Sequence, residues 1–258
     1  MQIVRISVHG KSKYGVLEGK IVQGYRGNPF AQSRGRTTSF SPDGTKYKLD
    51  EVKFLAPCVP SKIIGVGLNY RSHIAEINRP IPSLPKIFLK PPTSIIGPDD
   101  KIILPTLTKR VDYEGELGVV IGKKARNIPE DQAKEYVLGY TCINDVSERP
   151  SQEEDGQWTR AKGYDTFAPM GPGINTGIDG DNLKLETYLN GELRQSASTS
   201  DLVFGVSKIV SFISGVMTLL PGDVIATGTT SGIGQMKPGD VVEIKIENIG
   251  TLKNTVVG

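Results

Sequence analysis

The chain is predicted to fold as a mixed β protein with a few helices, an α+β class in which strands predominate. Short apolar runs recur along its 258 residues, and many of its 30 glycines and 17 prolines separate them, as expected for strands joined by turns. Few segments place apolar residues at helical spacing. The hydrophobic content of 37% and charged content of 23% are typical of a globular protein that buries a core without disulfides.

The first part of the chain, residues 1–50, is predicted to form a small N-terminal β-domain, and residues 51–258 a larger second domain. Glycines break the first part into short strands at residues 2–10, 14–19 and 21–25. A polar, glycine-containing loop is expected at residues 35–49, where it links the two parts.

The second part is predicted to begin with a strand at Ile63–Gly67, followed by a short helix at about residues 71–76. A proline-rich loop comes next, because a long helix cannot accommodate the prolines at positions 80, 82, 85, 91 and 92.

Beyond residue 111 we expect two strands, an amphipathic helix at residues 129–137 and an apolar strand at residues 138–144. Pro129 lies near the start of this helix, where its missing N–H costs least. A second helix is expected at residues 205–220, and its apolar face indicates core packing; that face comprises Val206, Ile209, Val210, Ile213, Val216 and Met217. The C-terminal segment is predicted to consist of strands joined by Pro-Gly-Asp turns.

Composition also limits the cellular setting and the partners. Cys58 and Cys142 lie far apart, without metal-type spacing, and are expected to be buried thiols in a reducing compartment. No run of about eighteen apolar residues and no signal-peptide pattern is present, so we expect a cytoplasmic protein without membrane association. The net charge of +3 comes from residues 1–48, but no aromatic-interleaved basic motif accompanies it, so no nucleic-acid partner is expected.

Two glutamates stand at the head of an apolar run in "VDYEGELGVVIG", residues 111–122. In a strand, Glu114 and Glu116 point to the same face, and two close carboxylates in a partly buried site raise a pKa or require a cation. An exposed edge strand with solvated glutamates is the alternative, but the following "GVVIG" indicates that the strand enters the core. Gly115 is expected to let a neighbour pack close to the opposite face.

A third acid, Asp145, follows the apolar strand "YTCIN". Together with Glu114 and Glu116 it matches the oxygen-only ligands of Mg²⁺ or Mn²⁺, with Ca²⁺ as a possible replacement. The chain has only two histidines, which disfavours zinc. The alternative for Asp145 alone is an acid that initiates a turn.

His73 and Glu76 are three residues apart and would meet on one face of a helix. An imidazole beside a carboxylate can take a proton from water, although a surface pair without function is the alternative. Their place between the glycine-rich "GVGLNY" and the proline-rich loop indicates a lid and favours catalysis.

Two further features contribute polar groups. Lys162 follows a loop that contains Trp158 and could polarise a carbonyl oxygen, while Thr227, Gly228 and Thr229 could hold a carboxylate. The run "GTTSGIG" lacks the Gly-Lys-Ser/Thr ending of a phosphate loop.

Read together, six segments resemble the fumarylacetoacetate hydrolase family, in its branch of small two-part proteins. They are "GLNYRSHIAE", "PKIFLKPPTSIIGP", "VDYEGELGVVIGKKARNI", "LGYTCINDVSERPSQ", "GQWTRAKGYDTFAPMGP" and "LLPGDVIATGTTSGIG", and they cover about residues 60–235. The resemblance implies a distorted β-roll catalytic domain, a small N-terminal β-domain and a homodimer.

The resemblance also implies roles for the residues. The carboxylates of Glu114, Glu116 and Asp145 would bind Mg²⁺ or Mn²⁺. The remaining roles are water activation by His73 with Glu76, charge stabilisation by Lys162, and substrate contacts from Tyr70, Arg149, Gln152, Thr227, Gly228 and Thr229. The chain departs from the family pattern at Glu148 and Pro150, which flank Arg149, and at Thr230, where proline is usual.

The implied chemistry is that of a 2-oxo acid that reacts through a metal-bound enolate. Acylpyruvate hydrolysis and oxaloacetate decarboxylation are the preferred reactions, because the His73–Glu76 pair provides a base for water. Isomerisation of a hydroxydienedioate, of the 2-hydroxyhepta-2,4-diene-1,7-dioate or 5-carboxymethyl-2-hydroxymuconate type, is the alternative. A non-catalytic ligand-binding module stabilised by Ca²⁺ is a third possibility.

Overall fold

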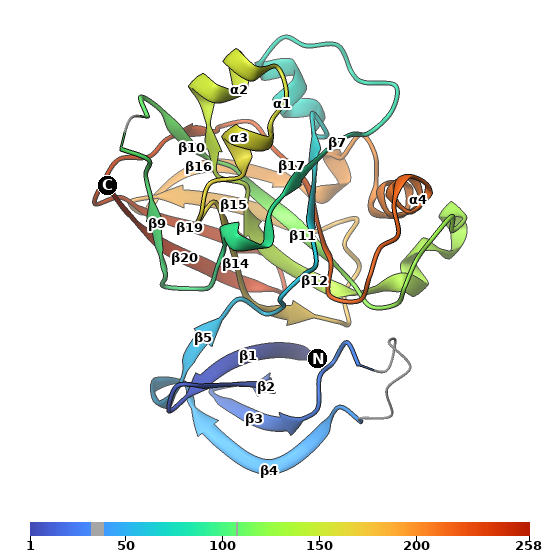
Figure 1. The fold of residues 1–258 in the computed structure, drawn as a ribbon, viewed down its shortest axis with the longest axis vertical. Helices are drawn as coiled ribbons and strands as arrows, with labels where there is room; N and C mark the ends of the chain where they lie inside the picture. The colour runs from blue at the N-terminus through green and yellow to red at the C-terminus, as the bar shows by residue number, and fades with distance from the viewer. Residues whose placement is uncertain (32–38, 107) are drawn as a thin grey trace.

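A computed structural model describes residues 1–31, 39–106 and 108–258 (Figure 1). Strands make up most of the regular structure in this part of the chain, which confirms the mixed β class. The strands form a large sheet, a five-stranded sheet and a small three-stranded sheet.

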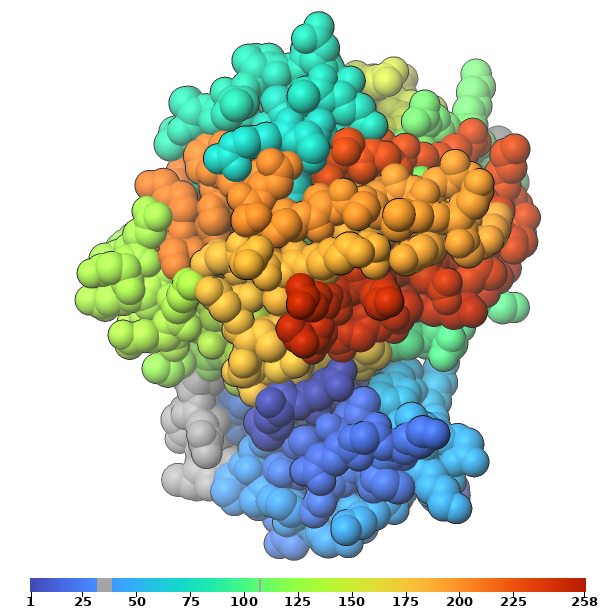
Figure 2. Space-filling model, turned by 180° about the vertical axis from the view of Figure 1, so that it is seen from behind, coloured from blue at the N-terminus to red at the C-terminus, as the bar shows by residue number. Residues whose placement is uncertain are grey.

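The N-terminal strands form the lower block of the molecule in Figures 1 and 2. They are β1 (Gln2–Val8), β2 (Lys11–Glu18), β3 (Ile21–Arg26), β4 (Ser41–Lys48) and β5 (Lys53–Leu55). The first three lie where glycine spacing predicted them. The chain then passes upward through a 3₁₀ turn, η2 (Leu49–Glu51), and through β5, which pairs with β1.

The expectation of a loop at residues 35–49 is wrong from residue 41 onward, because β4 pairs with β3 there. Residues 35–38 lie outside the described part of the chain. β4 is an edge strand with mostly exposed, polar side chains, so its composition is that of a loop. Its strand conformation depends on hydrogen bonds to a neighbour, and a local pattern does not contain that information.

The large sheet continues from the N-terminal block into the rest of the molecule, because β1 pairs with β14. Its order is β4-β3-β2-β1-β14-β12-β11-β17-β6-β7, with β8 also paired to β14. The added strands are β6 (Ile63–Gly67), β7 (Lys86–Lys90), β8 (Ile95–Ile96), β11 (Gly115–Ile121), β12 (Val137–Asn144), β14 (Ala168–Asn175) and β17 (Val224–Thr229).

The five-stranded sheet lies against the large sheet and occupies the middle of the face seen in Figure 2, above the N-terminal block. Its order is β16-β15-β19-β20-β9. Its strands are β9 (Lys101–Ile103), β15 (Lys184–Leu189), β16 (Glu192–Ser198), β19 (Val241–Ile246) and β20 (Gly250–Val257). The three-stranded sheet consists of β10 (Val111–Tyr113), β13 (Ser147–Glu148) and β18 (Gly234–Gln235).

The helices are short. Three of them, α1 (Arg71–Glu76), α2 (Arg149–Asp155) and α3 (Thr159–Lys162), gather at the top in Figure 1. The longest, α4 (Val206–Val216), buries Val206, Ile209, Val210 and Ile213 of the expected face, but Val216 is exposed. The helix ends a few residues earlier than predicted, so Met217 lies just beyond it. The other 3₁₀ turns are η3 (Pro92–Ser94), η4 (Glu130–Tyr136) and η5 (Thr199–Asp201).

The amphipathic α-helix expected at residues 129–137 is wrong, since η4 is a 3₁₀ helix. Ala133 is its only buried residue, so no wide apolar face stabilises an α-helical form. The pattern also gave no indication of α2 and α3. The start of α2 is nevertheless marked by two residue types: a proline, Pro150, lies in its first turn, and Glu148 precedes the helix. In the structure the Glu148 side chain accepts a hydrogen bond from the Ser151 amide.

Strand β11 is buried along its whole length, as its apolar run predicted. Leu117 and Val119 belong to the core cluster that includes α4 and β15, whereas Val120 faces a second cluster on the other side. The prediction for Gly115 is confirmed, because a Cβ there would lie 2.1 Å from Thr187 Oγ1. The Gly115 amide also donates to the side chain of Gln195 at 3.0 Å.

Both cysteines are free and buried, as expected. Burial raises the pKa of the Cys58 and Cys142 thiols to about 12. Within residues 1–31, 39–106 and 108–258, no helix is both long and apolar enough to span a membrane.

Candidate active site

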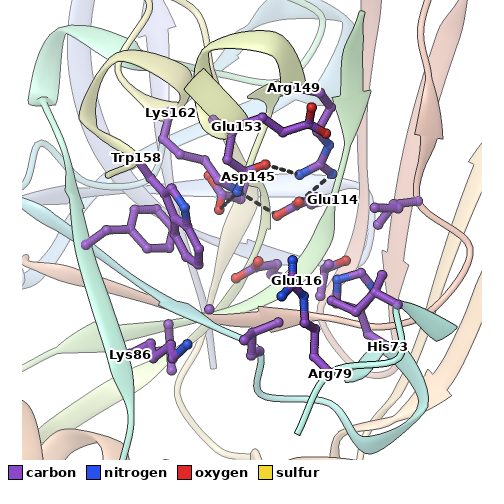
Figure 3. Close-up of a pocket in the computed structure, with 18 residues that line it drawn as sticks. His73, Arg79, Lys86, Glu114, Glu116, Asp145, Arg149, Glu153, Trp158 and Lys162 are labelled. Atoms are coloured by element: carbon purple, nitrogen blue, oxygen red, sulfur yellow. Dashed lines mark hydrogen bonds and ion pairs between the residues drawn. The ribbon is translucent and has the colours of Figure 1, made fainter. Parts of the chain in front are cut away.

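A cavity of about 720 Å³ opens between the three upper helices and the ends of the central strands (Figure 3). Aromatic and apolar side chains form much of its wall, and charged groups lie across its floor and mouth. The lining side chains that the argument uses are His73, Arg79, Lys86, Phe88, Glu114, Glu116, Asp145, Arg149, Gln152, Glu153, Trp158, Lys162 and Thr229.

The floor of the cavity holds the carboxylate cluster, which consists of Glu114, Glu116 and Asp145. All three residues are buried, and one oxygen from each lies within 4.8 Å of the others. Glu114 lies at a break between β10 and β11, which belong to different sheets, so residues 111–122 are not one continuous strand. The two glutamates converge nevertheless.

Strand pairing brings Asp145 to these glutamates. Gly115 is the register partner of Asn144 across β11 and β12. The Glu114 amide donates to Asn144 Oδ1 at 2.9 Å, and the Asp145 amide donates to the Glu114 carbonyl at 2.9 Å. The break in the β10–β11 segment is thus held by the end of β12, and both segments direct their acids into the cavity.

Each carboxylate has one oxygen held by a donor that contacts neither of the other two carboxylates. The pairs are Arg149 Nη2 with Glu114 Oε1 at 2.6 Å, Lys90 Nζ with Asp145 Oδ1 at 2.6 Å, and the Gly228 amide with Glu116 Oε2 at 2.7 Å. Lys162 Nζ bridges the second oxygens of Glu114 and Asp145, at 2.7 Å each. The oxygens that remain for a shared ligand are therefore Glu116 Oε1 and the two oxygens of Glu114 and Asp145 that Lys162 also contacts.

The three acids are not electrostatically equivalent. Burial, and then the charges of Asp145 and Glu114, raise the pKa of Glu116 well above its ordinary value. Burial alone would also raise the pKa of Glu114, but Lys162 and Arg149 outweigh it and hold that pKa below its ordinary value. Without a metal, Glu116 therefore binds a proton more readily than Glu114 does.

The donor set fits a hard divalent cation. Three carboxylate oxygens without nitrogen or sulfur ligands suit Mg²⁺ or Mn²⁺, and Ca²⁺ accepts the same ligands. The acids of the surrounding network are matched in number by its cations; the acids are Asp112, Glu114, Glu116 and Asp145, and the cations are Lys90, Arg110, Arg149 and Lys162. A bound cation would displace the proton of Glu116 and leave excess positive charge for an anionic ligand.

His73 and Glu76 meet as their spacing predicted, with His73 Nδ1 3.0 Å from Glu76 Oε2. The other carboxylate oxygen of Glu76 accepts a hydrogen bond from the Gly232 amide at 3.0 Å, which ties α1 to the glycine-rich turn. An ionised Glu76 requires the proton on Nδ1, so Nε2 of a neutral His73 is an acceptor. His73 lines the same cavity as the carboxylate cluster.

The turn at residues 227–229 mainly supports the cluster. Thr227 is buried and donates to the Leu117 carbonyl, and the Gly228 amide is used by Glu116. Gly228 has a φ of +103°, and a Cβ there would lie 2.9 Å from Asn69 Cβ, so a side chain does not fit. Thr229 lines the cavity.

The other predicted substrate contacts lie at different depths. Tyr70 is fully buried and does not line the cavity, and its hydroxyl has no hydrogen-bond partner among the described residues. Arg149 and Gln152 line the cavity, but Arg149 uses Nε for Asp112, Nη1 for Gln152 and Nη2 for Glu114. Direct substrate contact by these residues stays a prediction.

Several site residues were missed by the sequence patterns. Arg79, between α1 and β7, and Lys86, the first residue of β7, line the cavity. Phe88 contacts Trp158 with ring centroids 5.3 Å apart. Lys90 does not line the cavity but holds Asp145. The available signal for Lys90 was a lysine at the end of the apolar stretch "IFL". No local signal marks Arg79, Lys86 or Phe88, because their place in the cavity depends on how the chain between α1 and β7 folds back.

The chain belongs to the fumarylacetoacetate hydrolase family, an enzyme family. Residues 62–257 match the fumarylacetoacetate (FAA) hydrolase C-terminal family, and residues 1–57 match the Rv2993c-like N-terminal family. The resemblance stated from the sequence motifs is thereby confirmed.

Among individual relatives, an uncharacterized protein of Archaeoglobus fulgidus is 57% identical over 83% of this chain and 86% of its own length. The mitochondrial oxaloacetate tautomerase Fahd2a of Rattus norvegicus is 43% identical over 80% of this chain and 70% of its own. The crystal structure of a 5-carboxymethyl-2-hydroxymuconate delta-isomerase from Mycobacterium smegmatis matches with a TM-score of 0.91, at 43% identity over 100% of this chain and 99% of that one. The fold expected from the resemblance is confirmed.

Proposed function

We propose that this protein is a divalent-metal-dependent enzyme that cleaves a carbon–carbon bond in a 2-oxo acid, by acylpyruvate hydrolysis, oxaloacetate decarboxylation or both. One observation carries the proposal: the cavity that holds the carboxylate cluster is also lined by His73, whose Nδ1 is held by Glu76. Hydrolysis needs a base for water, and the free Nε2 provides one.

The carboxylate cluster would hold Mg²⁺ or Mn²⁺, which supplies Lewis-acid chemistry at the 2-oxo group. His73 Nε2 accepts a proton from the attacking water, and Glu76 stabilises the resulting imidazolium. Lys162 lies above the cluster and donates a hydrogen bond to the oxygen on which negative charge develops. Phe88 and Trp158 present aromatic surfaces along one wall, where a flat conjugated substrate can pack.

The cavity also carries positive charge away from the cluster. Arg79 and Lys86 line it, and no ion pair involves either residue within the described part of the chain. We propose that these two side chains receive a second anionic group, such as the distal carboxylate of fumarylpyruvate or of a hydroxydienedioate. Such a contact between charged groups strengthens binding more than a neutral hydrogen bond does.

Replacement of both Arg79 and Lys86 by alanine is expected to lower kcat/KM for fumarylpyruvate by about tenfold or more, because hydrogen bonds between charged groups contribute about 1.5–3 kcal/mol. Acetylpyruvate has no distal carboxylate and should be affected much less. Glu153→Gln, which removes an acid from the same cavity, is the matched control. Equal losses for the two substrates would contradict the assignment.

The alternative function is isomerisation of a hydroxydienedioate or tautomerisation of a 2-oxo diacid. Its support is that the solved relative is described as a delta-isomerase and the rat relative as an oxaloacetate tautomerase. Both reactions move a proton without attack by water. A ligand-binding module with a structural Ca²⁺ is the remaining alternative. The homodimer and the cytoplasmic location implied by the sequence stay predictions.

An activity screen tests the proposal. Purified protein with added Mg²⁺ or Mn²⁺ is assayed with oxaloacetate, acetylpyruvate, fumarylpyruvate and hydroxydienedioates. We expect pyruvate release from at least one of the first three. Spectral change of a dienedioate without any cleavage would favour the isomerase.

Calorimetry with oxalate, which mimics the enolate of pyruvate, separates an enzyme from a structural Ca²⁺ module. The enzyme site should bind oxalate only when metal is present.

A further inference from the structure

Lys90 is a lysine whose side chain has no exposed surface. Its ammonium nitrogen lies 2.6 Å from Asp145 Oδ1 and 3.2 Å from the Val146 carbonyl. Both acceptors belong to the segment that directly follows β12. Full burial of a lysine is rare in proteins, and its location beside one member of the carboxylate cluster calls for a specific role.

The location of Lys90 follows from how the large sheet curves. Lys90 ends β7, the last strand of the sheet order, and the chain then crosses through η3 to β8, which pairs with β14. β14 is adjacent to β12. The connection from β7 to β8 therefore links the edge of the large sheet to β14, which lies several strands away in the sheet order. Pro91 and Pro92 restrict the backbone of this connection. This connection places Lys90 beside Asp145, although Lys90 does not line the cavity.

The contact determines how Asp145 can act. Oδ1 is held by Lys90, whereas Oδ2 contacts Lys162, which lines the cavity. With one oxygen held, the carboxylate cannot rotate to present both oxygens to a cation. Arg149 holds Glu114 in a similar way, but Arg149 also lines the cavity, whereas Lys90 does not and so acts on a ligand only through Asp145.

We propose that Lys90 is a positioning residue of the metal site, which fixes Asp145 as a ligand through Oδ2 alone. The inference rests on the proposed metal-dependent function. Outer residues that orient metal ligands typically affect metal affinity by about 10–100-fold. Lys90 belongs to the segment "PKIFLKPPTSIIGP", and this role accounts for a charged residue at the end of its apolar strand.

The test is a titration of purified Lys90→Met with Mn²⁺, followed by electron paramagnetic resonance. We expect binding weaker than in the wild type by about 10–100-fold, together with a changed spectrum of the bound ion. Circular dichroism shows whether the metal-free variant is folded. The matched control is Lys62→Met, since Lys62 forms an ion pair with the fully buried Asp223, and neither residue lines the cavity.

The control separates positioning from general stabilisation. Lys62→Met should lower the melting temperature and leave Mn²⁺ affinity unchanged. Wild-type affinity and spectrum in folded Lys90→Met would overturn the proposal. If Lys90→Met does not fold, Lys90→Gln, which keeps a polar side chain, undergoes the same titration with the same criterion. Absence of Mn²⁺ binding by the wild type would overturn the proposed metal-dependent function itself, and the role of Lys90 with it.

Discussion

Glu116→Gln is expected to abolish turnover and to weaken Mg²⁺ or Mn²⁺ binding by on the order of 100-fold or more. This loss should exceed that from replacing a residue that only orients a metal ligand, which is about 10–100-fold. Glu116 is the best position for this test because, among the described residues, the only hydrogen bond to its side chain comes from a backbone amide, that of Gly228. A glutamine there leaves no cation unpaired, whereas substitution of Glu114 would remove a partner of both Arg149 and Lys162. The fold should therefore survive, and the loss should report on the metal.

Chelation provides the companion measurement. EDTA should remove the activity of the wild type, and added Mg²⁺ or Mn²⁺ should restore it. A chelator-insensitive wild-type enzyme, or a Glu116→Gln variant with full metal affinity, would contradict the three-carboxylate site.

The same experiment has a defined pH dependence. The pKa of Glu116 is raised in the metal-free protein, and the metal binds the ionised form, so binding releases a proton below that pKa. Metal affinity should thus increase with pH, by about tenfold per unit for one released proton, and level off above the raised pKa. Calorimetry in buffers of different ionisation enthalpy measures the released proton, and Glu116→Gln should no longer release it.

His73→Ala is expected to lower acylpyruvate hydrolysis by about 10²–10⁴-fold, the usual contribution of a positioned general base. Metal binding should remain intact, because His73 contacts Glu76 and none of the three carboxylates. The measurement is kcat for acetylpyruvate together with an Mn²⁺ titration of the same preparation.

The chain supplies its own control, since its other histidine, His9, is exposed in the turn between β1 and β2. His9→Ala should leave both quantities unchanged. Glu76→Gln should lower the rate less than His73→Ala does, because it perturbs the orientation of the imidazole but leaves the base in place. Full hydrolytic activity in His73→Ala would show that water is activated elsewhere.

Local sequence patterns predicted most of the elements in which the pattern of apolar residues matches the residues that the fold buries. β11 is an apolar run that is buried on both faces, and α4 has apolar residues at helical spacing, of which Val206, Ile209, Val210 and Ile213 are buried. The patterns failed where a neighbour decides the conformation. β4 is polar and exposed, and only pairing with β3 makes it a strand. The segment of η4 has helical spacing but buries a single alanine, so it forms a 3₁₀ turn.

The residues of the candidate site also fall into two groups: those that local spacing predicted and those whose partners lie far away in the sequence. Glu114 and Glu116 were found because two acids at the head of an apolar strand are costly without a cation, and the His73–Glu76 pair because it lies within one helical turn. Lys90 and Arg149 act on carboxylates far away in the sequence, so no spacing rule identifies their partners. Tyr70 is fully buried and is not among the residues that line the cavity, so its predicted substrate contact stays a prediction.

The sequence by itself determined the class of fold, the family and the chemical identity of the groups proposed to bind metal and to accept a proton, since each of these depends on residue type and short-range spacing. Only the tertiary structure decided which donor holds each carboxylate oxygen, which cations neutralise the cluster and where Arg79 and Lys86 lie. The physical reason is that these properties arise from contacts across the sheet, as between Lys90 and Asp145, where strand order brings distant residues within hydrogen-bond distance.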